Sequence, residues 1–174
     1  MRRWRRKKGD SEEPADHALG RSKGGFTTKI HLLADGSGNP LGFYLTAGQV
    51  HDSTVVDEVM ITANDLTDSN GKPIAWPVAL GGDKGYRADW IDRYLIELGI
   101  QPVIPSKSNE DRNSRSVPFD QERYRNRNIV ERVIGWLKEY RRVFSRFEKS
   151  AKNFGGMVRL GFIQRYLKTL DLGL

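Results

Sequence analysis

A single carboxylate stands among cations in the stretch from Tyr124 to Lys138, YRNRNIVERVIGWLK. Its periodicity predicts one long helix, on which Tyr124, Arg127, Glu131 and Lys138 fall within roughly 60° of one another. Apolar side chains occupy the neighbouring arc, so we expect Glu131 at the edge of a core. A carboxylate in that position, flanked by cations, can hold a metal ion beside a phosphate backbone. Taken alone, the stretch is explained equally well as an amphipathic surface helix with an intrahelical Arg–Glu pair.

A second carboxylate, Asp83, follows the short apolar run IAWPVAL at residues 74–80 and lies in the turn GGDKGY. The run predicts a buried strand with both faces covered, although Pro77 weakens that interpretation. An acid at the C-terminal end of a buried strand is where α/β sheets present reactive groups. A structural role as a turn-forming residue is the alternative for Asp83.

The elements that must position these two acids predict an α/β fold. Residues 26–34 and 41–47 are rich in β-formers and flank the turn cluster DGSGNP, which predicts an antiparallel hairpin. A helix over 88–98 between strands at 74–80 and 101–104 implies a parallel pair with a right-handed crossover. Further helices are expected over 55–66 and 149–170, outside the long helix described above. His31 lies in the middle of the first hairpin strand and is expected to be a packed or surface histidine.

The charge of the chain points to a polyanionic partner. The sequence of 174 residues fits one domain, and its net charge is +7 with a pI of about 9.7. Nucleic acid is favoured over a membrane surface, and a basic protein without such a partner is the alternative. One segment is densely basic and forms a plausible phosphate track. Its cationic residues are Arg123, Arg125, Arg127, Arg132, Lys138, Arg141, Arg142 and Arg146.

Other features limit the class of protein. The chain has no cysteine, which excludes disulfides and thiolate metal sites. We find no apolar run as long as a membrane span and no signal peptide, so we expect a cytoplasmic protein. Residues 1–20 combine a basic run, MRRWRRKKG, with the acidic DSEEPAD and show no periodicity. They predict a polar, disordered tail before a domain at 21–174.

The spacing Tyr-x-x-Arg-x-x-x-Glu, completed by Lys138 seven residues later, resembles the signature of bacterial insertion-sequence transposases of the DDE type, in the IS-four/IS-five group. Asp83, within DKGY, resembles the second acid of these enzymes. The block GRSKGGFTTKIHLLADGSGNPLGFYLTAGQVHDST is similar to the segment between their first and second acids, and KNFGGMVRLGFIQRYL is similar to their C-terminal helix. The resemblance runs from about Glu13 to Leu170.

This resemblance implies a ribonuclease H-like fold, a mixed sheet with helices on both sides. It also implies three carboxylates that hold two divalent ions, Mg²⁺ or Mn²⁺, for cleavage and transfer of DNA strands. Asp83 and Glu131 would be the second and third of these metal ligands. Double-stranded DNA at the element ends and target is the implied partner, in a homo-oligomeric complex. The side chains expected to contact or orient DNA are Tyr124, Arg127 and Lys138 from the signature, and Arg132, Arg141 and Arg142 from the basic segment.

The family's first acid lies on a first strand, in an Asp-Ser/Gly-Thr motif upstream of the GRSKGG block. Asp10 follows a basic run that cannot form a buried strand. Asp52 begins the string Asp-Ser-Thr, but it comes after the hairpin and inside the GQ-x-HDS block, so we interpret it as structural. We therefore expect the first strand and first Asp to be absent from this chain. It would be a truncated copy, or a second reading frame with an upstream-encoded fragment as its partner.

Three functional hypotheses follow. The chain is a transposase domain that cleaves and transfers DNA strands, a catalytically incomplete remnant that only binds DNA, or a repurposed ribonuclease H-like nuclease. A missing first strand would also leave unpaired strand edges and exposed apolar surface. That predicts marginal stability or self-association of the isolated chain.

Overall fold

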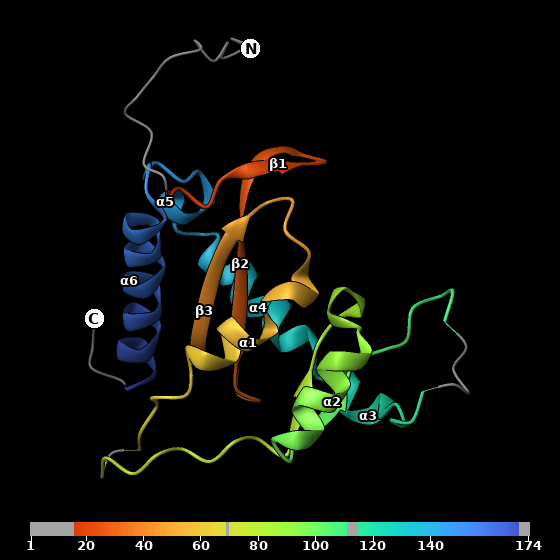
Figure 1. Cartoon of the computed structure of the whole chain (residues 1–174). Coiled ribbons are helices and arrows are strands. Elements are labelled where there is room, and N and C mark those ends of the chain that lie inside the picture. Colours follow the sequence, from red (N-terminus) through yellow and green to blue (C-terminus); the bar gives the residue numbers. More distant parts are fainter. Residues whose placement is uncertain (1–15, 69, 111–114, 171–174) are drawn as a thin grey trace.

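The computed structural model describes residues 16–68, 70–110 and 115–170. It has a mixed α/β fold with flanking helices, as the sequence predicts, but the described strands form two small sheets instead of the one mixed sheet expected (Figure 1). Most of the predicted tail, residues 1–15, lies outside the described residues. None of the helices in the described ranges is long and apolar enough to cross a membrane.

The predicted hairpin is confirmed to within one residue at each strand end. Strands β2 (Gly25–Ala34) and β3 (Pro40–Ala47) pair antiparallel, with Thr28 opposite Ala47. In the turn, the Asp35 carboxylate accepts hydrogen bonds from the backbone N–H groups of Ser37 and Asn39 at 2.9 and 2.8 Å. A short strand, β1 (Gly20–Ser22), pairs antiparallel with the start of β2.

The predicted parallel pair is also confirmed, but its first strand is shorter than expected. Strands β4 (Ala79–Gly81) and β5 (Gln101–Val103) are parallel and are connected through helix α2 (Asp89–Glu97). Residues 74–78 are not a buried strand, because Ile74 and Val78 are 56% and 75% exposed. Pro77 explains the difference, since its ring nitrogen has no hydrogen to donate to a sheet.

The single long helix predicted over 124–138 is wrong. The segment forms α3 (Gln121–Arg125) and α4 (Asn128–Leu137), so Tyr124 lies on α3, Arg127 in the connection and Lys138 at the end of α4. The backbone tightens between the helices, where Arg127 N–H donates to the Tyr124 carbonyl three residues earlier. Asn126 and Asn128 are weak helix formers, because their side chains compete for backbone hydrogen bonds.

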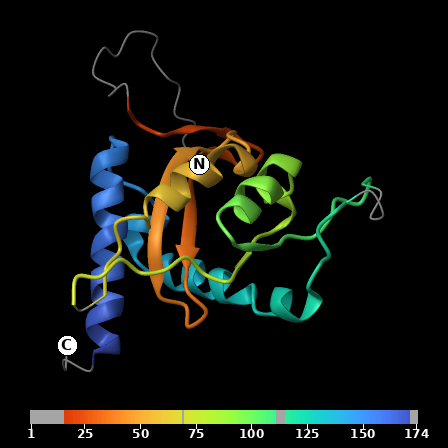
Figure 2. The same ribbon diagram turned by 60° about the horizontal axis from the view of Figure 1, so that its bottom comes forward.

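The remaining helices surround the sheets. The helix expected over 55–66 is a turn η1 (Asp52–Val55) followed by the short α1 (Val56–Ile61). The expected C-terminal helix is confirmed as α6 (Ala151–Thr169), capped by Ser150. Figures 1 and 2 show α6 beside β3 on one side of the molecule and α2 with α3 on the other. Two short elements complete the set, η2 (Lys84–Tyr86) and α5 (Arg141–Phe144).

Two hydrophobic cores lie on the two sides of the molecule. The α2 core consists of Val56, Met60, Ile91, Leu95, Ile100 and Ile104. The α6 core consists of Leu137, Val143, Phe154, Val158 and Phe162, against which β2 and β3 pack with Ile30, Leu32, Phe43 and Leu45.

Residues 16–19, expected in a tail, are attached to the α6 side of the molecule. The Asp16 carbonyl accepts from the Ala151 N–H at 3.1 Å, and the Ala18 carbonyl accepts from the Arg146 guanidinium at 3.2 Å and from the Thr28 hydroxyl at 2.6 Å. Arg146 also contacts the Thr28 hydroxyl and packs over the Phe154 ring, 4.9 Å from its centroid. These contacts give Arg146 an internal structural role, so its assignment to an exposed phosphate track is wrong.

Candidate active site

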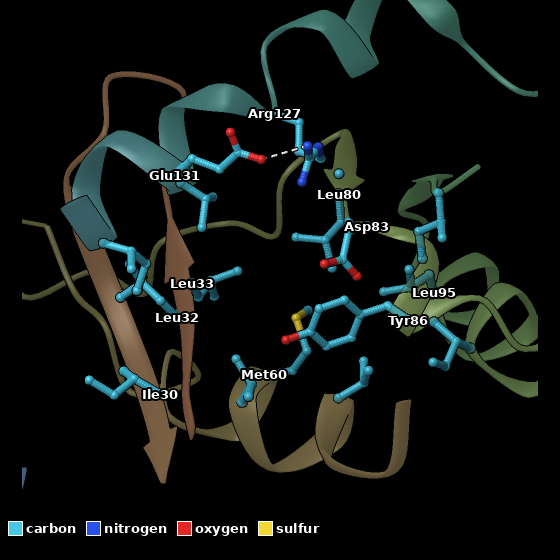
Figure 3. Close-up of a pocket in the computed structure, with 18 of the residues that line it drawn as sticks. Ile30, Leu32, Leu33, Met60, Leu80, Asp83, Tyr86, Leu95, Arg127 and Glu131 are labelled. Atoms are coloured by element: carbon cyan, nitrogen blue, oxygen red, sulfur yellow. Dashed lines mark ion pairs between the residues drawn. The ribbon is translucent and has the colours of Figure 1, made fainter. Parts of the chain in front are cut away.

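Both predicted acids line one cavity of about 460 Å³ between β2 and β4 (Figure 3). Most of the lining is apolar and comes from β2, α1, α2 and α4. Four charged residues border it as well: Asp83, Arg127, Glu131 and Lys138. The structure therefore brings together two acids that are 48 positions apart in the sequence.

Asp83 is held at the end of β4 by its own turn. It caps η2, and its Oδ1 accepts a hydrogen bond from the Gly85 N–H at 2.8 Å. The exposed carboxylate points into the cavity (Figure 3). A Cβ added at Gly85 would lie 2.7 Å from Asp52 Oδ2 and 2.9 Å from Asp83 Oδ1. The glycine of DKGY thus permits two carboxylates to approach the same turn.

Glu131 borders the same cavity from α4. It pairs with Arg127 at 2.6 Å, and the Arg127 guanidinium lies over the Tyr124 ring at 5.4 Å from its centroid. Tyr124, Arg127 and Glu131 of the signature therefore stay in contact even though the helix is broken. The Glu131 side chain is 60% exposed, and an exposed pair of this kind contributes about 0–1 kcal/mol. Breaking the ion pair with Arg127 therefore costs little free energy, and the Glu131 carboxylate can take another partner.

A polar network that the sequence reasoning missed lies beside Asp83. His31 is buried, with Nε2 at 2.8 Å from the Thr46 hydroxyl and Nδ1 at 3.1 Å from the Tyr86 hydroxyl. Lys29 Nζ donates to Asp52 Oδ1 at 2.8 Å. Lys29 and His31 share one face of β2, and Thr46 lies opposite Lys29 on β3. The alternation of side chains between the two faces of the predicted hairpin could have placed Lys29, His31 and Thr46 on the same face.

Burial sets the protonation of this network. Burial lowers the pKa of His31, an effect that the Asp52 charge opposes, so the imidazole is favoured in its neutral form. Burial and the charges of Asp52 and Asp83 raise the pKa of Tyr86, which keeps its phenol protonated. The neutral His31 imidazole and the protonated Tyr86 phenol therefore lie near the carboxylates of Asp52 and Asp83.

A second network outside the cavity was also missed. Asp92 on α2 is buried and pairs with Arg115 at 2.8 Å and with Arg87 at 3.3 Å. Arg87 also contacts Glu110, so the chain after β5 is held against α2. Asp92 and Arg115 are 23 positions apart, and no local sequence pattern links them.

The predicted DNA-contacting residues are placed on α3, α4 and the segment after α4. Arg132, Lys138 and Arg141 are exposed, whereas Tyr124 and Arg127 are half-buried. Arg142 is exposed and forms an ion pair with Glu148 at 3.1 Å.

Asp83 and Glu131 carry the kind of donor atom that a divalent ion takes. Their donors are carboxylate oxygens that border one cavity, and such donors suit Mg²⁺ or Mn²⁺. Across residues 16–68, 70–110 and 115–170, no group of three or more His, Cys, Asp or Glu side chains is arranged to hold a metal ion. The described residues thus provide two candidate ligands and leave further positions for other donors.

Comparison with known proteins identifies the family. The family model described as "Transposase DDE domain" matches residues 3–163. A protein of Burkholderia cepacia named as a transposase for insertion sequence element IS402 is 31% identical over 160 residues, covering 92% of this chain and 69% of that protein. A protein of Brucella ovis named as a transposase for element IS6501 is 30% identical over 144 residues, covering 82% of this chain and all of that protein. No solved structure matches the chain. The chain therefore belongs to the transposase DDE domain family, among the transposases of insertion sequences.

Proposed function

We propose that this protein carries out metal-dependent DNA strand cleavage and transfer at the ends of an insertion sequence, through Asp83 and Glu131. The observation that carries this proposal is that both acids border one cavity, Asp83 from the turn after β4 and Glu131 from α4. The hairpin, the parallel pair and the flanking helices support a ribonuclease H-like arrangement. A transposase of this kind acts on DNA in the cytoplasm, as a homo-oligomer on paired ends.

Each residue of the site has a proposed task. When bound, a divalent ion supplies activation of an oxygen nucleophile and stabilisation of the leaving oxygen. The Gly85 N–H orients Asp83 toward the cavity. Glu131 would hold the ion in place of its ion pair with Arg127, and the Arg127 guanidinium would then be available to bind a phosphate oxygen. Tyr124 keeps that guanidinium in place through its ring.

The exposed cations on and after α4 are proposed to bind the DNA backbone. They are Arg132, Lys138, Arg141 and Arg142. Each phosphate contact releases counterions, so loss of one contact should reduce the slope of log K against log salt by about 0.9. Substituting Arg132 with Ala should lower affinity for all DNA sequences alike.

Strand cleavage of DNA that carries the element ends tests the catalytic proposal. We expect nicking in Mg²⁺ or Mn²⁺, abolished by Glu131→Gln and by Asp83→Asn. Glu139→Gln is the matched control, because Glu139 is exposed just after α4 and does not line the cavity. Equal nicking by wild type and Glu131→Gln would overturn the proposed role of Glu131.

A chain that only binds DNA is the second candidate. It is favoured by the absence, among the described residues, of any group of three or more His, Cys, Asp or Glu side chains arranged to hold a metal ion. Binding of Mn²⁺, followed by electron paramagnetic resonance, separates the two candidates without relying on activity. Salt-sensitive DNA binding together with Mn²⁺ binding equal to that of the Asp83→Asn, Glu131→Gln double variant would favour the DNA-binding protein.

A further inference from the structure

The three most exposed aromatic side chains among the described residues gather at one end of the molecule. Phe26, Phe144 and Phe147 are 62%, 71% and 61% exposed. Phe26 lies at the start of β2, where β1 pairs with it, and the other two lie on and just after α5. Figure 1 shows β1 and α5 at this same end, away from α2 and α3. Phenylalanine is commonly buried, so three exposed rings at one end indicate a binding surface.

Arg146 connects the two parts of this surface. Its guanidinium contacts the Thr28 hydroxyl and donates to the Ala18 carbonyl at 3.2 Å. Thr28 and Phe26 are two residues apart on β2, so their side chains share one face of the strand. Phe147 follows Arg146 directly along the chain. The face of β2 that carries Phe26 therefore adjoins the segment that carries Phe147.

The backbone of this segment keeps both of its phenylalanines outside the core. Helix α5 places Val143 in the α6 core and leaves Phe144 outside it. Arg146 then has a φ of 37°, in the left-handed region that ends many helices and that costs free energy for a residue other than glycine. The contacts of the Arg146 guanidinium stabilise this conformation, which turns the chain just before Phe147. The exposure of both rings therefore follows from a defined backbone conformation.

Cations surround the three rings. Residues 16–28 and 141–152, which include all three phenylalanines, contain seven Lys or Arg residues and only two acids, Asp16 and Glu148. Glu148 forms an ion pair with Arg142 at 3.1 Å. Besides Arg142, the exposed cations in these ranges are Arg21, Lys23, Arg141, Lys149 and Lys152. This excess of positive charge favours a polyanionic ligand.

We propose that Phe26, Phe144 and Phe147, together with these cations, form a binding site for single-stranded DNA. Unpaired bases stack on aromatic rings while their phosphates contact Lys and Arg. The bases of a duplex are already stacked and paired, so a duplex would use only the cations. Helix α5 has four residues and is not the long amphipathic helix that binds a membrane surface. The site goes beyond the strand cleavage proposed above, and it needs neither a metal ion nor Asp83 and Glu131.

Binding of an oligothymidylate to the full chain tests the site. The probe is a fluorescein-labelled strand of about twelve thymidines, which does not pair with itself, in a buffer that contains EDTA. By fluorescence anisotropy, the Phe144→Leu, Phe147→Leu double variant should bind the strand at least about tenfold more weakly than wild type, because leucine keeps the apolar character and removes the stacking face. Phe144→Trp with Phe147→Trp should bind at least as tightly as wild type. Circular dichroism verifies folding, and Phe26→Leu is a second variant on a different element.

Three controls separate stacking from charge and from other exposed rings. Trp90 lies on α2, on the other side of the molecule, and is 39% exposed, so Trp90→Leu should leave binding of the strand unchanged. A duplex of the same length should bind equally to wild type and to the leucine double variant, since its phosphates contact only the cations. Lys23→Ala should reduce the slope of log K against log salt for the single strand by about 0.7.

The remaining outcomes decide against the proposal. Equal affinity of wild type and the folded leucine double variant for the strand would overturn the site, and so would an equal loss of duplex binding. Tighter binding to vesicles of phosphatidylcholine and phosphatidylserine would assign the rings to a membrane surface, and tighter binding of oligouridylate would assign them to RNA. The Asp83→Asn, Glu131→Gln double variant should bind the strand as wild type does, so failure of the catalytic proposal leaves this result unaffected.

Discussion

The two hydrophobic cores differ in how completely they are enclosed. The α6 core lies between the β2–β3 hairpin and α6, and none of its buried residues lines the cavity. The α2 core is open on one side, since Val56, Met60, Ile91, Leu95 and Ile104 all line the cavity. The α6 core is therefore the closed one, and it is formed by α6 packing against the β2–β3 hairpin. The open core surrounds the two short parallel strands, and Asp83 stands at its border.

This difference suggests that the α6 core mainly stabilises the fold, whereas the α2 core also shapes the candidate site. Packing in the α6 core holds the hairpin and α4, and so it positions Glu131, although none of the buried residues of this core lines the cavity. The α2 core carries β4 and the turn of Asp83, where fewer atoms surround the lining side chains. A change at the α6 core should therefore unfold the protein, whereas a change at the α2 core should alter the site at lower cost in stability.

A matched pair of leucine substitutions tests this comparison most strongly. Leu137 and Leu95 are both fully buried, the first in the α6 core and the second at the cavity. Leu137→Ala should lower the free energy of unfolding by about 4–5 kcal/mol, near the upper end of such substitutions, and Leu95→Ala by about 2–3 kcal/mol. Leu95 loses less because part of its surface already faces an empty volume. Urea denaturation measures both.

Leu160→Ala is the surface control for this pair. Leu160 lies on α6 and is 56% exposed, so its loss should change the free energy of unfolding by no more than about 0.5 kcal/mol. Equal large losses at Leu137 and Leu95 would mean that the cavity is closed or filled in solution, and the contrast between the cores would disappear.

Gly85→Ala tests whether the positions of the Asp52 and Asp83 carboxylates, at the edge of the α2 core, depend on the absence of a side chain at residue 85. The added methyl would lie within 3 Å of both the Asp52 and the Asp83 carboxylates, so at least one must move. We expect a loss of about 1–2 kcal/mol in the free energy of unfolding, because a hydrogen bond of Asp83 or Asp52 is weakened, together with weaker Mn²⁺ binding. Gly36→Ala, at a turn with open space, is the control. Unchanged Mn²⁺ affinity in both Gly85→Ala and Asp83→Asn would remove Asp83 from the ligand set.

A pair of helical glycines gives a smaller effect of opposite sign. Gly135→Ala should raise the free energy of unfolding by about 0.5–1 kcal/mol, because alanine favours the helix and its Cβ meets open space. At Gly161 the Cβ would lie 3.0 Å from Leu137 Cδ1 in the closed core, so Gly161→Ala should gain less or become destabilising. Thermal denaturation of both variants checks the difference. An equal increase in the free energy of unfolding for Gly161→Ala would show that the α6 core can accommodate the added methyl group.

The sequence predicted the parts of the molecule that depend on local patterns. The DGSGNP turn with its flanking β-formers located the hairpin, and the apolar spacing of 88–98 located α2. Three of the four signature residues, Tyr124, Arg127 and Glu131, lie in contact as their spacing predicted, since i to i+3 and i to i+4 contacts survive a tight break in a helix. The break itself and the short β4 depend on competition between local backbone preferences and packing, which periodicity does not measure.

The candidate site was predicted only as far as its two acids. The approach of Asp52 to Asp83 depends on how η1 and η2 pack, and the two positions are 31 residues apart. From the sequence, Asp52 was interpreted as a structural residue at the entry to a helix. Its approach to Gly85, in the turn that Asp83 caps, was not predicted. Long-range pairs of this kind, like Asp92 with Arg115, leave no spacing signal in a single sequence.

The buried histidine between the hairpin and the Asp83 turn gives the smallest expected effect. Burial lowers the pKa of His31 in the folded protein, and the Asp52 charge offsets part of that shift. The unfolded chain has a histidine pKa of about 6.5 and binds a proton first as the pH falls. The free energy of unfolding should therefore be unaffected by His31 above about pH 6.5 and fall below it, until the folded-state pKa is passed. Urea denaturation between pH 7.5 and 5.5 should show a shallower decline in His31→Gln, with the exposed His51→Gln behaving as wild type. If wild type and His31→Gln decline in parallel, folding does not lower the pKa of His31, and the proposed effect of burial on this histidine is wrong.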